Sequence, residues 1–160
     1  MTSNELANKY QKKSDKEHVL DNPDTYIGSV ENVESFNWIY ESDKNLFEYK
    51  QHNYIPGLYK LFDEGIVNSR DHVVRMTNKN PVTYINIGIN EEGVIEICND
   101  GDGIDVAIHP EHEVYIPELI FGHLRTSTNY DKTEQKVIGG KHGYGAKLTN
   151  IFSTSFKVES

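Results

Sequence analysis

The segment from Pro56 to Val74 constrains the fold of this chain most, because it carries two helical stripes side by side. Its opening proline suits the first turn of a helix. Apolar and small residues recur at the spacing of one helix face and predict a buried side: Leu58, Leu61, Phe62, Gly65, Ile66 and Ser69. Glu64, Asn68 and Asp71 follow a second, polar stripe along the same helix. The chain therefore has to supply a layer that covers the apolar side.

The residues that follow this helix predict that layer. Val82 to Ile89 alternates apolar and polar residues, with Ile85, Ile87 and Ile89 on one side. Residues 90–93 have turn chemistry, and Val94 to Cys98 returns as a second alternating run. This pattern predicts a β-hairpin, and with the helix it predicts an α+β fold.

Beyond the hairpin, glycines and short periodic runs set the expected organisation. Pro117 to Leu124 is expected to be helical, and the polar stretch from Arg125 to Lys136 is expected to be a lid, since it lacks apolar periodicity. Glycines at 139–145 lead into a helix expected at Ala146–Phe152, and Ser155–Glu159 is expected to be a strand.

The N-terminal part is expected to lie outside the core. Residues 1–30 are polar and are broken at Pro23 and Gly28, which is typical of an arm or strap, so core burial is expected to begin only after them. An aromatic-rich stretch follows, and its few basic residues favour ordinary packing over stacking on nucleic acid: Trp38, Tyr40, Phe47, Tyr49 and Tyr54.

Charge and cysteine content exclude several classes of function. With 25 acidic and 16 basic residues, the chain has a formal net charge of −9, the wrong sign for a domain that coats itself with DNA backbone. A single cysteine, Cys98, makes no intrachain disulfide, and His109 and His112 are expected to be solvated surface rather than zinc ligands. The chain has no apolar leader and no run long enough to span a membrane, so we expect a soluble, intracellular protein.

Glu64 and Asn68 are the first candidates for chemistry. They lie one helical turn apart, so a carboxylate and an amide oxygen share one face. A partly desolvated carboxylate can hold a water that attacks a phosphoryl group, and an amide oxygen can ligate Mg²⁺. The alternative is that both residues are solvated helix surface.

Asn99 is the second candidate. It ends a predicted strand and begins the sequence Asn-Asp-Gly-Asp-Gly, whose glycines let the backbone pass close to a flat ligand. An asparagine amide pairs with the amine and ring nitrogen of adenine, whereas Asp100 and Asp102 would repel phosphates. The loop therefore suits the base end of a nucleotide, and the alternative is a plain glycine-rich turn.

The glycine loop from Gly140 to Lys147 is the third candidate. Its backbone N–H groups precede a helix N-terminus, where negative charge is favoured, and Lys141, His142 and Lys147 add side-chain donors. The spacing is not that of a Walker loop or of a dinucleotide fingerprint. The loop suits phosphates, although a lone run of this kind is a weak signal.

The order of these features resembles the GHKL (Bergerat) ATPases, and several longer runs resemble the N-terminus of eukaryotic-type DNA topoisomerase II. The runs cover residues 22–29, 56–64, 120–130, 139–148 and 150–154. This resemblance implies a two-layer α/β sandwich with a mixed sheet and helices on one face, incomplete at its C-terminal end. It divides the chain into an N-terminal strap, 1–30, and the N-terminal part of a GHKL ATPase domain, 31–160.

The resemblance also implies a role for each candidate residue. Glu64 matches the general base, Asn68 the magnesium ligand and Asn99 the adenine contact. The lid-side contacts to ribose and phosphate match Ser127, Thr128 and Asn129. The phosphate loop matches Gly140, Lys141, His142, Gly143, Tyr144, Gly145, Ala146 and Lys147. Tyr26 matches a strap tyrosine that reaches the partner's nucleotide in an ATP-closed dimer.

The implied function is an ATP- and Mg²⁺-dependent gate whose homodimer closes through the strap and supports DNA strand passage, with DNA held by domains that these 160 residues lack. Cellular relatives act in the nucleus. Two departures from the family stand out, namely His72 in place of an asparagine and Gly65 in place of an aliphatic residue. The alternatives are a truncated or split, non-catalytic nucleotide-binding or dimerisation module, and another superfamily member such as a chaperone or a MutL-like protein.

Overall fold

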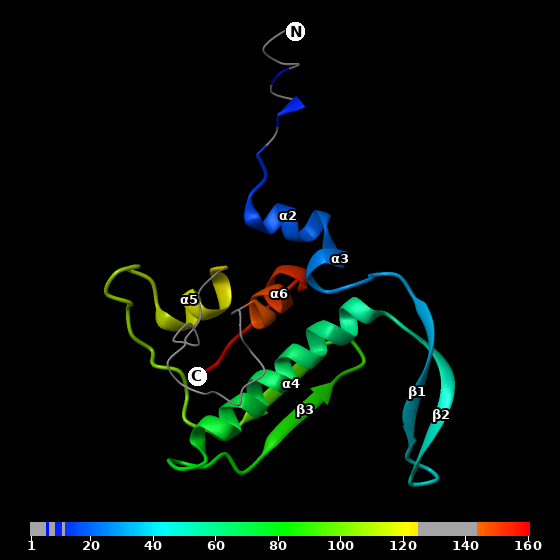
Figure 1. The fold of residues 1–160 in the computed structure, drawn as a ribbon. Helices are drawn as coiled ribbons and strands as arrows, with labels where there is room; N and C mark the ends of the chain where they lie inside the picture. The colour runs from blue at the N-terminus through cyan, green and yellow to red at the C-terminus, as the bar shows by residue number, and fades with distance from the viewer. Residues whose placement is uncertain (1–5, 7–8, 11, 125–143) are drawn as a thin grey trace.

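The computed structural model describes residues 6, 9–10, 12–124 and 144–160, and its elements are arranged as Figure 1 shows. In chain order they are α2 (Asp15–Asp21), α3 (Pro23–Tyr26), β1 (Val33–Glu41), β2 (Leu46–Tyr54), α4 (Pro56–Met76), β3 (Ile85–Ile89), β4 (Ile95–Asn99), α5 (Ile116–Gly122) and α6 (Gly145–Phe152). The α+β class is therefore confirmed. The strands of the described residues pair as two separate antiparallel hairpins.

The long predicted helix is confirmed as α4. Pro56 occupies its first turn, as expected. Ser69 lies on the buried side, but Leu58 is 55% exposed, contrary to the prediction. The reason is that the chain before the helix covers a different side of its first turn, where the Gly57 amide donates to the Ser29 carbonyl at 2.8 Å.

The hairpin after α4 is also confirmed, with Ile87 opposite Ile97 and Ile89 opposite Ile95. Its first strand begins at Ile85 rather than Val82. The backbone N–H groups of Thr83 and Tyr84 donate to the Asp100 carboxylate at 2.8 and 3.1 Å, so they are bound by a side chain rather than by a neighbouring strand.

Gly65 allows this hairpin to lie against α4. A β-carbon at Gly65 would stand 2.5 Å from Cδ1 of Ile97, so a larger residue would require the end of that side chain to shift. The family departure at this position therefore has a packing role here. The helix accepts a cost of about 1 kcal/mol for an interior glycine relative to alanine.

A second hairpin, β1–β2, was not predicted. Trp38 pairs with Tyr49 and Tyr40 with Phe47, and the turn between the strands contains Asn45 with a positive φ of 53°. Aromatic residues alternating along both strands, with a polar turn between them, are the signal that would have revealed it. Figure 1 shows the hairpin extending away from α4 and α6.

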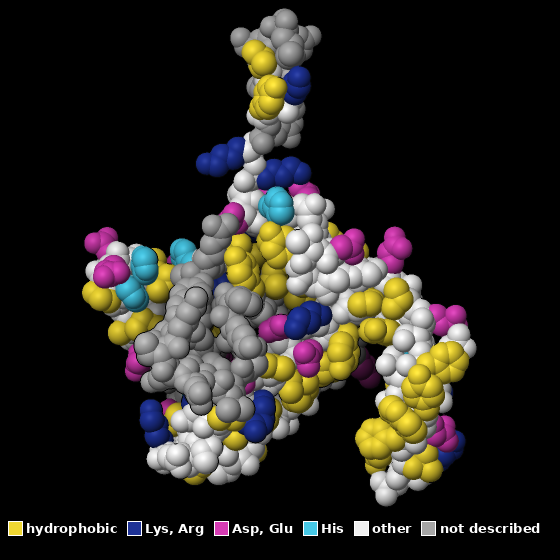
Figure 2. Space-filling model, in the orientation of Figure 1, with side chains coloured by type: hydrophobic (Ala, Val, Ile, Leu, Met, Phe, Trp, Pro, Cys, Tyr) yellow, Lys and Arg dark blue, Asp and Glu magenta, His cyan; other side chains and the backbone are white. Residues whose placement is uncertain are grey.

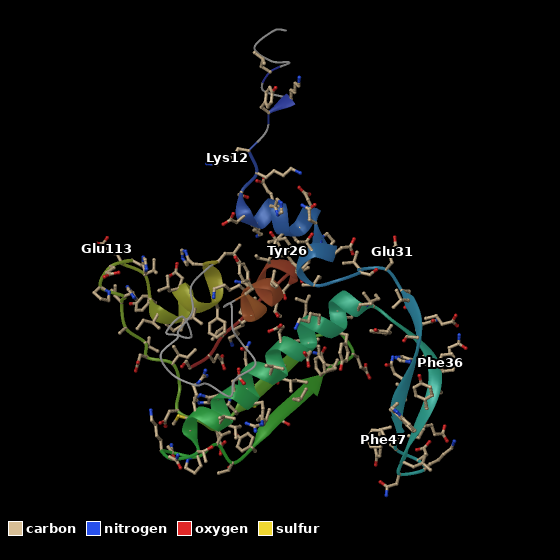
Figure 3. The ribbon with its side chains drawn as sticks, in the orientation of Figure 1. Lys12, Tyr26, Glu31, Phe36, Phe47 and Glu113 are labelled. Carbon is tan, nitrogen blue, oxygen red and sulfur yellow. The ribbon has the colours of Figure 1, made fainter. Side chains whose placement is uncertain are left out.

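The aromatic side chains of this hairpin do not pack in the way the sequence suggested. Trp38 is 67% exposed and Tyr49 59% exposed, and their ring centroids are 5.4 Å apart. Figures 2 and 3 show apolar side chains along the hairpin, with Phe36 and Phe47 labelled. The expectation of ordinary packing is therefore wrong for four of the five aromatic residues, whose rings cover one another across the strands and remain open to solvent: Trp38, Tyr40, Phe47 and Tyr49. Tyr54 is half-buried, and its ring meets that of Tyr59 on α4.

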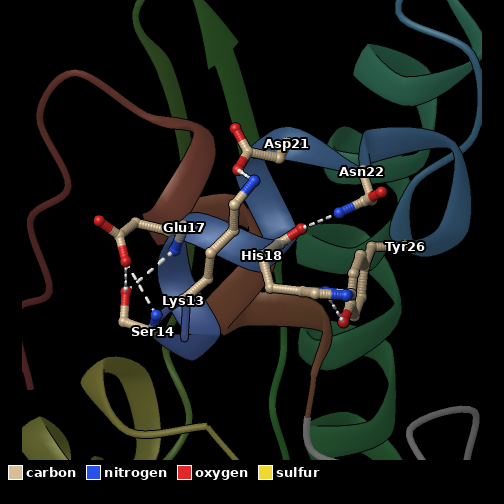
Figure 4. A network of polar contacts seen from close by, with 7 residues as sticks. All are labelled: Lys13, Ser14, Glu17, His18, Asp21, Asn22 and Tyr26. Carbon is tan, nitrogen blue, oxygen red and sulfur yellow. Dashed lines mark hydrogen bonds and ion pairs between the residues drawn. The ribbon is translucent and has the colours of Figure 1, made fainter. Parts of the chain in front are cut away.

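The core begins within the segment expected to be a strap. Val19 of α2 is 1% exposed and Ile27 is 6% exposed, and both pack with Leu148 of α6. The helix α2 is stabilised by a capping box between Ser14 and Glu17, drawn in Figure 4. The expectation that core burial starts after residue 30 is therefore wrong. Each of two short polar stretches contributes one buried apolar side chain, Val19 and Ile27, to the core.

Residues 155–159 form no strand, contrary to the prediction. The segment is tied to Ile104 through the Ser160 hydroxyl, which accepts from the Ile104 N–H at 2.5 Å and donates to the Ile104 carbonyl at 3.0 Å. A strand needs backbone pairing, and this contact uses a side chain. None of the described helices combines the length and the apolar character needed to span a bilayer.

Candidate functional site

Glu64 of α4 lies directly against the first residue of α6. A β-carbon at Gly145 would overlap the Glu64 carboxylate, and it would stand 2.7 Å from Cδ of that side chain. The two helices also share a hydrogen bond from the Thr149 hydroxyl to the Leu61 carbonyl at 3.4 Å. The N-terminal end of α6 therefore meets the polar stripe of α4 with no side chain between them.

The Glu64 carboxylate pairs with Lys60, one turn earlier on the same helix. Their atoms Nζ and Oε1 are 2.5 Å apart, and the Glu64 side chain is 20% exposed while that of Lys60 is 46% exposed. The hydrogen bond to Glu64 raises the pKa of Lys60. Sequence reasoning missed Lys60, although its spacing of four residues from Glu64 is the signal for such a pair.

Asn68 continues the stripe of Glu64 along α4 and is half-buried. Asp71, beyond it, is only 6% exposed, so this polar stripe is not solvated helix surface. A carboxylate and an amide oxygen on one face suit Mg²⁺, which takes few protein ligands and keeps waters and phosphate oxygens around it. Within the described part of the chain, no three His, Cys, Asp or Glu side chains converge as a metal cluster.

Asn99 ends β4 and is half-buried. Its Oδ1 accepts a hydrogen bond from the Gly101 N–H at 3.1 Å. It belongs to the hairpin that packs on α4, so the strand end is attached to the helix that carries Glu64 and Asn68.

At the start of α6, Lys147 is buried, with 4% of its surface exposed. Burial lowers its pKa to about 8, because removal from water disfavours the ammonium form. Tyr144 precedes the helix and packs against the core of Val19, Ile27 and Leu148, and its carbonyl accepts from the Leu148 N–H at 2.8 Å. Ala146 lies half-buried between them.

Tyr26 lies on α3, over the same core. Figure 4 shows its hydroxyl directed at His18 of α2, with the hydroxyl oxygen 3.0 Å from Nδ1. The two rings meet edge to face, with centroids 5.9 Å apart. In this chain the tyrosine is thus engaged by its own N-terminal helix.

The remaining predicted site residues lie outside the described residues. They are Ser127, Thr128, Asn129, Gly140, Lys141, His142 and Gly143. The described structure brings Glu64 to the start of α6, with Asn68 one turn further along α4, and it attaches the strand that ends in Asn99 to the same helix through the packing of β4 on α4. The close approach of Gly145 to Glu64 could not be read from the sequence, because 81 residues separate the two.

Known proteins similar to this chain in sequence and in fold are type II DNA topoisomerases. No protein-family profile matches the chain. DNA topoisomerase 2 of Candida glabrata is 52% identical over 155 residues, which is 96% of this chain. DNA topoisomerase 2 of Acanthamoeba polyphaga mimivirus is 49% identical over an alignment of 161 positions that covers 97% of this chain. The crystal structure of the ATPase region of Saccharomyces cerevisiae topoisomerase II superposes with a TM-score of 0.87 and 52% identity over 92% of this chain.

The chain is a homologue of the ATPase region of DNA topoisomerase II. The ATPase and transducer domains of the Balamuthia mandrillaris topoisomerase II give a similar result, with a TM-score of 0.86 and 46% identity over 96% of this chain. The chain spans 11% of the Candida glabrata protein and 39% of the Saccharomyces cerevisiae ATPase-region structure. The resemblance to topoisomerase II is confirmed, and the reading as a chaperone or a MutL-like protein is not supported.

Proposed function

We propose that this chain forms the nucleotide-binding part of the ATP gate of a type II DNA topoisomerase. ATP binds between α4, the end of β4 and the start of α6, and closure of a homodimer follows. DNA is handled by other parts of such an enzyme, in keeping with the net charge of −9 here, and the enzyme acts in the nucleus if its source is cellular.

The observation that carries the proposal is the contact of Glu64 with Gly145. A helix N-terminus favours negative charge and offers backbone N–H groups to phosphate. Glu64 faces that end from α4, where a carboxylate is suited to take the proton of a water attacking the terminal phosphate. Glycine at 145 keeps this space free of a side chain.

Asn68 supplies an amide oxygen on the same face and is the proposed ligand of Mg²⁺. When bound, the ion neutralises charge on the phosphates. Lys60 holds the Glu64 carboxylate at 2.5 Å, so it orients the proposed base before nucleotide arrives. Lys147 lies buried in the first turn of α6, where an ammonium group would counter phosphate charge.

At the base end, Asn99 is the proposed adenine contact, and the lid and the rest of the glycine loop supply the other proposed contacts. Tyr26 is the proposed contact in trans. To reach a partner's nucleotide its hydroxyl must leave His18, so dimer closure would exchange one hydrogen bond for another.

A second candidate is a split, non-catalytic module that binds nucleotide without turning it over. The two candidates share the nucleotide site and differ only in turnover.

The test is magnesium-dependent binding of a non-hydrolysable ATP analogue, measured by calorimetry, followed by ATP turnover in an enzyme carrying the remaining domains of a relative. Glu64→Gln should keep binding and lose turnover, because the amide has the same shape but takes no proton. Asn68→Ala should lose only the magnesium-dependent part of the affinity, and Asn53→Ala on the exposed hairpin is the matched control.

Each candidate predicts a different result. Binding together with turnover that depends on Glu64 supports the ATPase gate. Binding without turnover in the completed enzyme supports the non-catalytic module. Failure of the folded, completed enzyme to bind the analogue contradicts both.

A further inference from the structure

Two carboxylates of the turn that follows Asn99 attach it to the chain that precedes β3. Asp100 accepts from the backbone of Thr83 at 2.8 Å and of Tyr84 at 3.1 Å, and it also accepts from the Thr83 hydroxyl. That hydroxyl contact, followed by the backbone ones, lowers the pKa of Asp100. Asp102 accepts from the Asn80 amide at 2.8 Å. These hydrogen bonds hold the side of the turn that faces residues 80–84, which we call its outer edge.

The inner edge is held by His72, two turns along α4 from Glu64. A β-carbon at Gly101 would overlap Nε2 of His72, and it would stand 2.6 Å from Cδ2 of that ring and 2.7 Å from Cγ2 of Val82. Gly101 is not among the glycines with positive φ, so the residue is required here for space rather than for backbone conformation. The imidazole therefore lies against the Gly101 backbone.

Gly101 in turn determines which side of the Asn99 amide carries the oxygen and which carries the NH₂ group. Its N–H donates to Asn99 Oδ1 at 3.1 Å. If the Asn99 amide were flipped, its NH₂ group would face the Gly101 N–H, and donors would oppose each other. The amide oxygen is therefore kept on the Gly101 side. One lone pair of that oxygen and both amide hydrogens stay available. A fixed amide of this kind distinguishes adenine, which presents an amino donor, from guanine, which presents a carbonyl acceptor at the same place.

We propose that His72 is a positioning residue for base selection, which acts through Gly101 to fix the orientation of the Asn99 amide. The inference rests on the proposed function, because it takes Asn99 as the contact to the base. The proposal gives a role to His72, which occupies a position where the family has asparagine. A smaller residue at 72 would leave Val82 as the remaining close neighbour of Gly101 on the inner edge of the turn, where the imidazole now lies.

The first test needs no nucleotide. In the nucleotide-free protein, the side-chain NH₂ signals of Asn99 and the exchange protection of the Gly101 amide are followed by nuclear magnetic resonance. His72→Ala should shift or broaden the Asn99 signals and speed exchange at Gly101, while His109→Ala, a loop histidine whose ring packs on His112, should leave both unchanged. Unchanged Asn99 signals in a folded His72→Ala variant would overturn the proposal.

The second test measures selectivity. The ratio of affinities for ATP and GTP analogues should fall by about tenfold in His72→Ala, the size expected when one well-placed hydrogen bond to the base is lost. Gly101→Ala should show a similar fall because its methyl group meets the ring, and the double variant His72→Ala/Gly101→Ala should recover part of the selectivity. Selectivity unchanged in all three overturns the proposal, whereas a wild-type protein that binds neither analogue contradicts the proposed function and leaves the resonance test to judge the role of His72.

Discussion

Two regions of the molecule are held together by different kinds of contact: the junction, where α6 and β4 pack on α4, and the β1–β2 hairpin. At the junction, elements from distant parts of the sequence approach so closely that glycines are required, at Gly65 against Ile97 and at Gly145 against Glu64. In the hairpin, neighbouring strands pack mainly on each other and leave Trp38 67% exposed. Contacts at the junction therefore depend on the position of several elements at once, whereas those of the hairpin depend on its own register.

This difference predicts where substitutions have large effects. A methyl group added at the junction displaces the side chain that it meets, the Glu64 carboxylate or the end of Ile97, because packed interiors tolerate little added volume. The removal of a whole indole ring from the hairpin affects only local packing.

The largest expected effect is on ATP turnover by Gly145→Ala. The new methyl group overlaps the Glu64 carboxylate, which must swing aside to make room. The carboxylate is the end of a flexible side chain, so the fold should survive. Turnover in the completed enzyme should fall by about a hundredfold, as for a catalytic group misplaced by an ångström.

The matched control for this substitution is Gly88→Ala in β3, where a β-carbon would meet nothing within 4 Å. Steady-state turnover and circular dichroism measured on both variants separate a site effect from a folding effect. Equal turnover in Gly145→Ala and Gly88→Ala would mean that Glu64 is not held at the position where it acts.

The second prediction concerns the sign of a stability change at Gly65. Alanine there gains about 1 kcal/mol of helix propensity but meets Cδ1 of Ile97 at 2.5 Å, an overpacking that costs about 1–3 kcal/mol. Gly65→Ala should therefore destabilise the protein in denaturant unfolding. When Ile97→Val has first removed the δ-methyl group, the same substitution should stabilise by about 1 kcal/mol.

The double-mutant cycle is decisive here because the two backgrounds are expected to differ in sign. If Gly65→Ala is stabilising in both, α4 and β4 are not in the contact described, and the glycine is merely a weak helix residue. If it is destabilising in both, another neighbour restricts the space above α4.

The sequence predicted structure within single elements, but it did not predict contacts between elements that are far apart in the chain. The α4 helix and the β3–β4 hairpin were predicted because periodicity is a local property, and Glu64, Asn68 and Asn99 were singled out by spacing within those elements. The contacts of Gly145 with Glu64 and of Gly101 with His72 were not predicted, because they arise from packing between elements. The β1–β2 hairpin was missed for a different reason, since its aromatic residues were weighed only as ordinary packing or as nucleic-acid stacking, and their alternation along two strands was not considered.

The third prediction is a proton taken up on nucleotide binding. Burial lowers the pKa of Lys147 to about 8, and phosphate oxygens beside it would favour the charged form and raise that pKa. Between about pH 8 and pH 10, the free protein holds Lys147 partly neutral while the complex holds it charged. Binding should therefore take up protons in this range and weaken as the pH rises through it.

Calorimetric titrations at pH 8.5 in two buffers of different ionisation enthalpy measure this uptake directly. The observed enthalpies should differ between the buffers at pH 8.5 and agree at pH 6.5, where Lys147 is charged in both states. In Lys147→Met the difference at pH 8.5 should vanish, and identical enthalpies for the wild type at pH 8.5 would show that no phosphate lies beside Lys147.

The smallest expected effect is that of Trp38→Ala in the hairpin. The ring is 67% exposed and meets Tyr49 at 5.4 Å across the strands, so its loss should cost about 0.5–1 kcal/mol of stability. Affinity for the nucleotide analogue should stay at the wild-type value, because β1 and β2 pack mainly on each other. Thermal unfolding followed by circular dichroism, together with calorimetric binding, gives both quantities. A loss of more than about 3 kcal/mol, the scale of a buried aromatic residue, or a loss of nucleotide binding, would show that the hairpin supports the junction after all, and the contrast between the two regions would not hold.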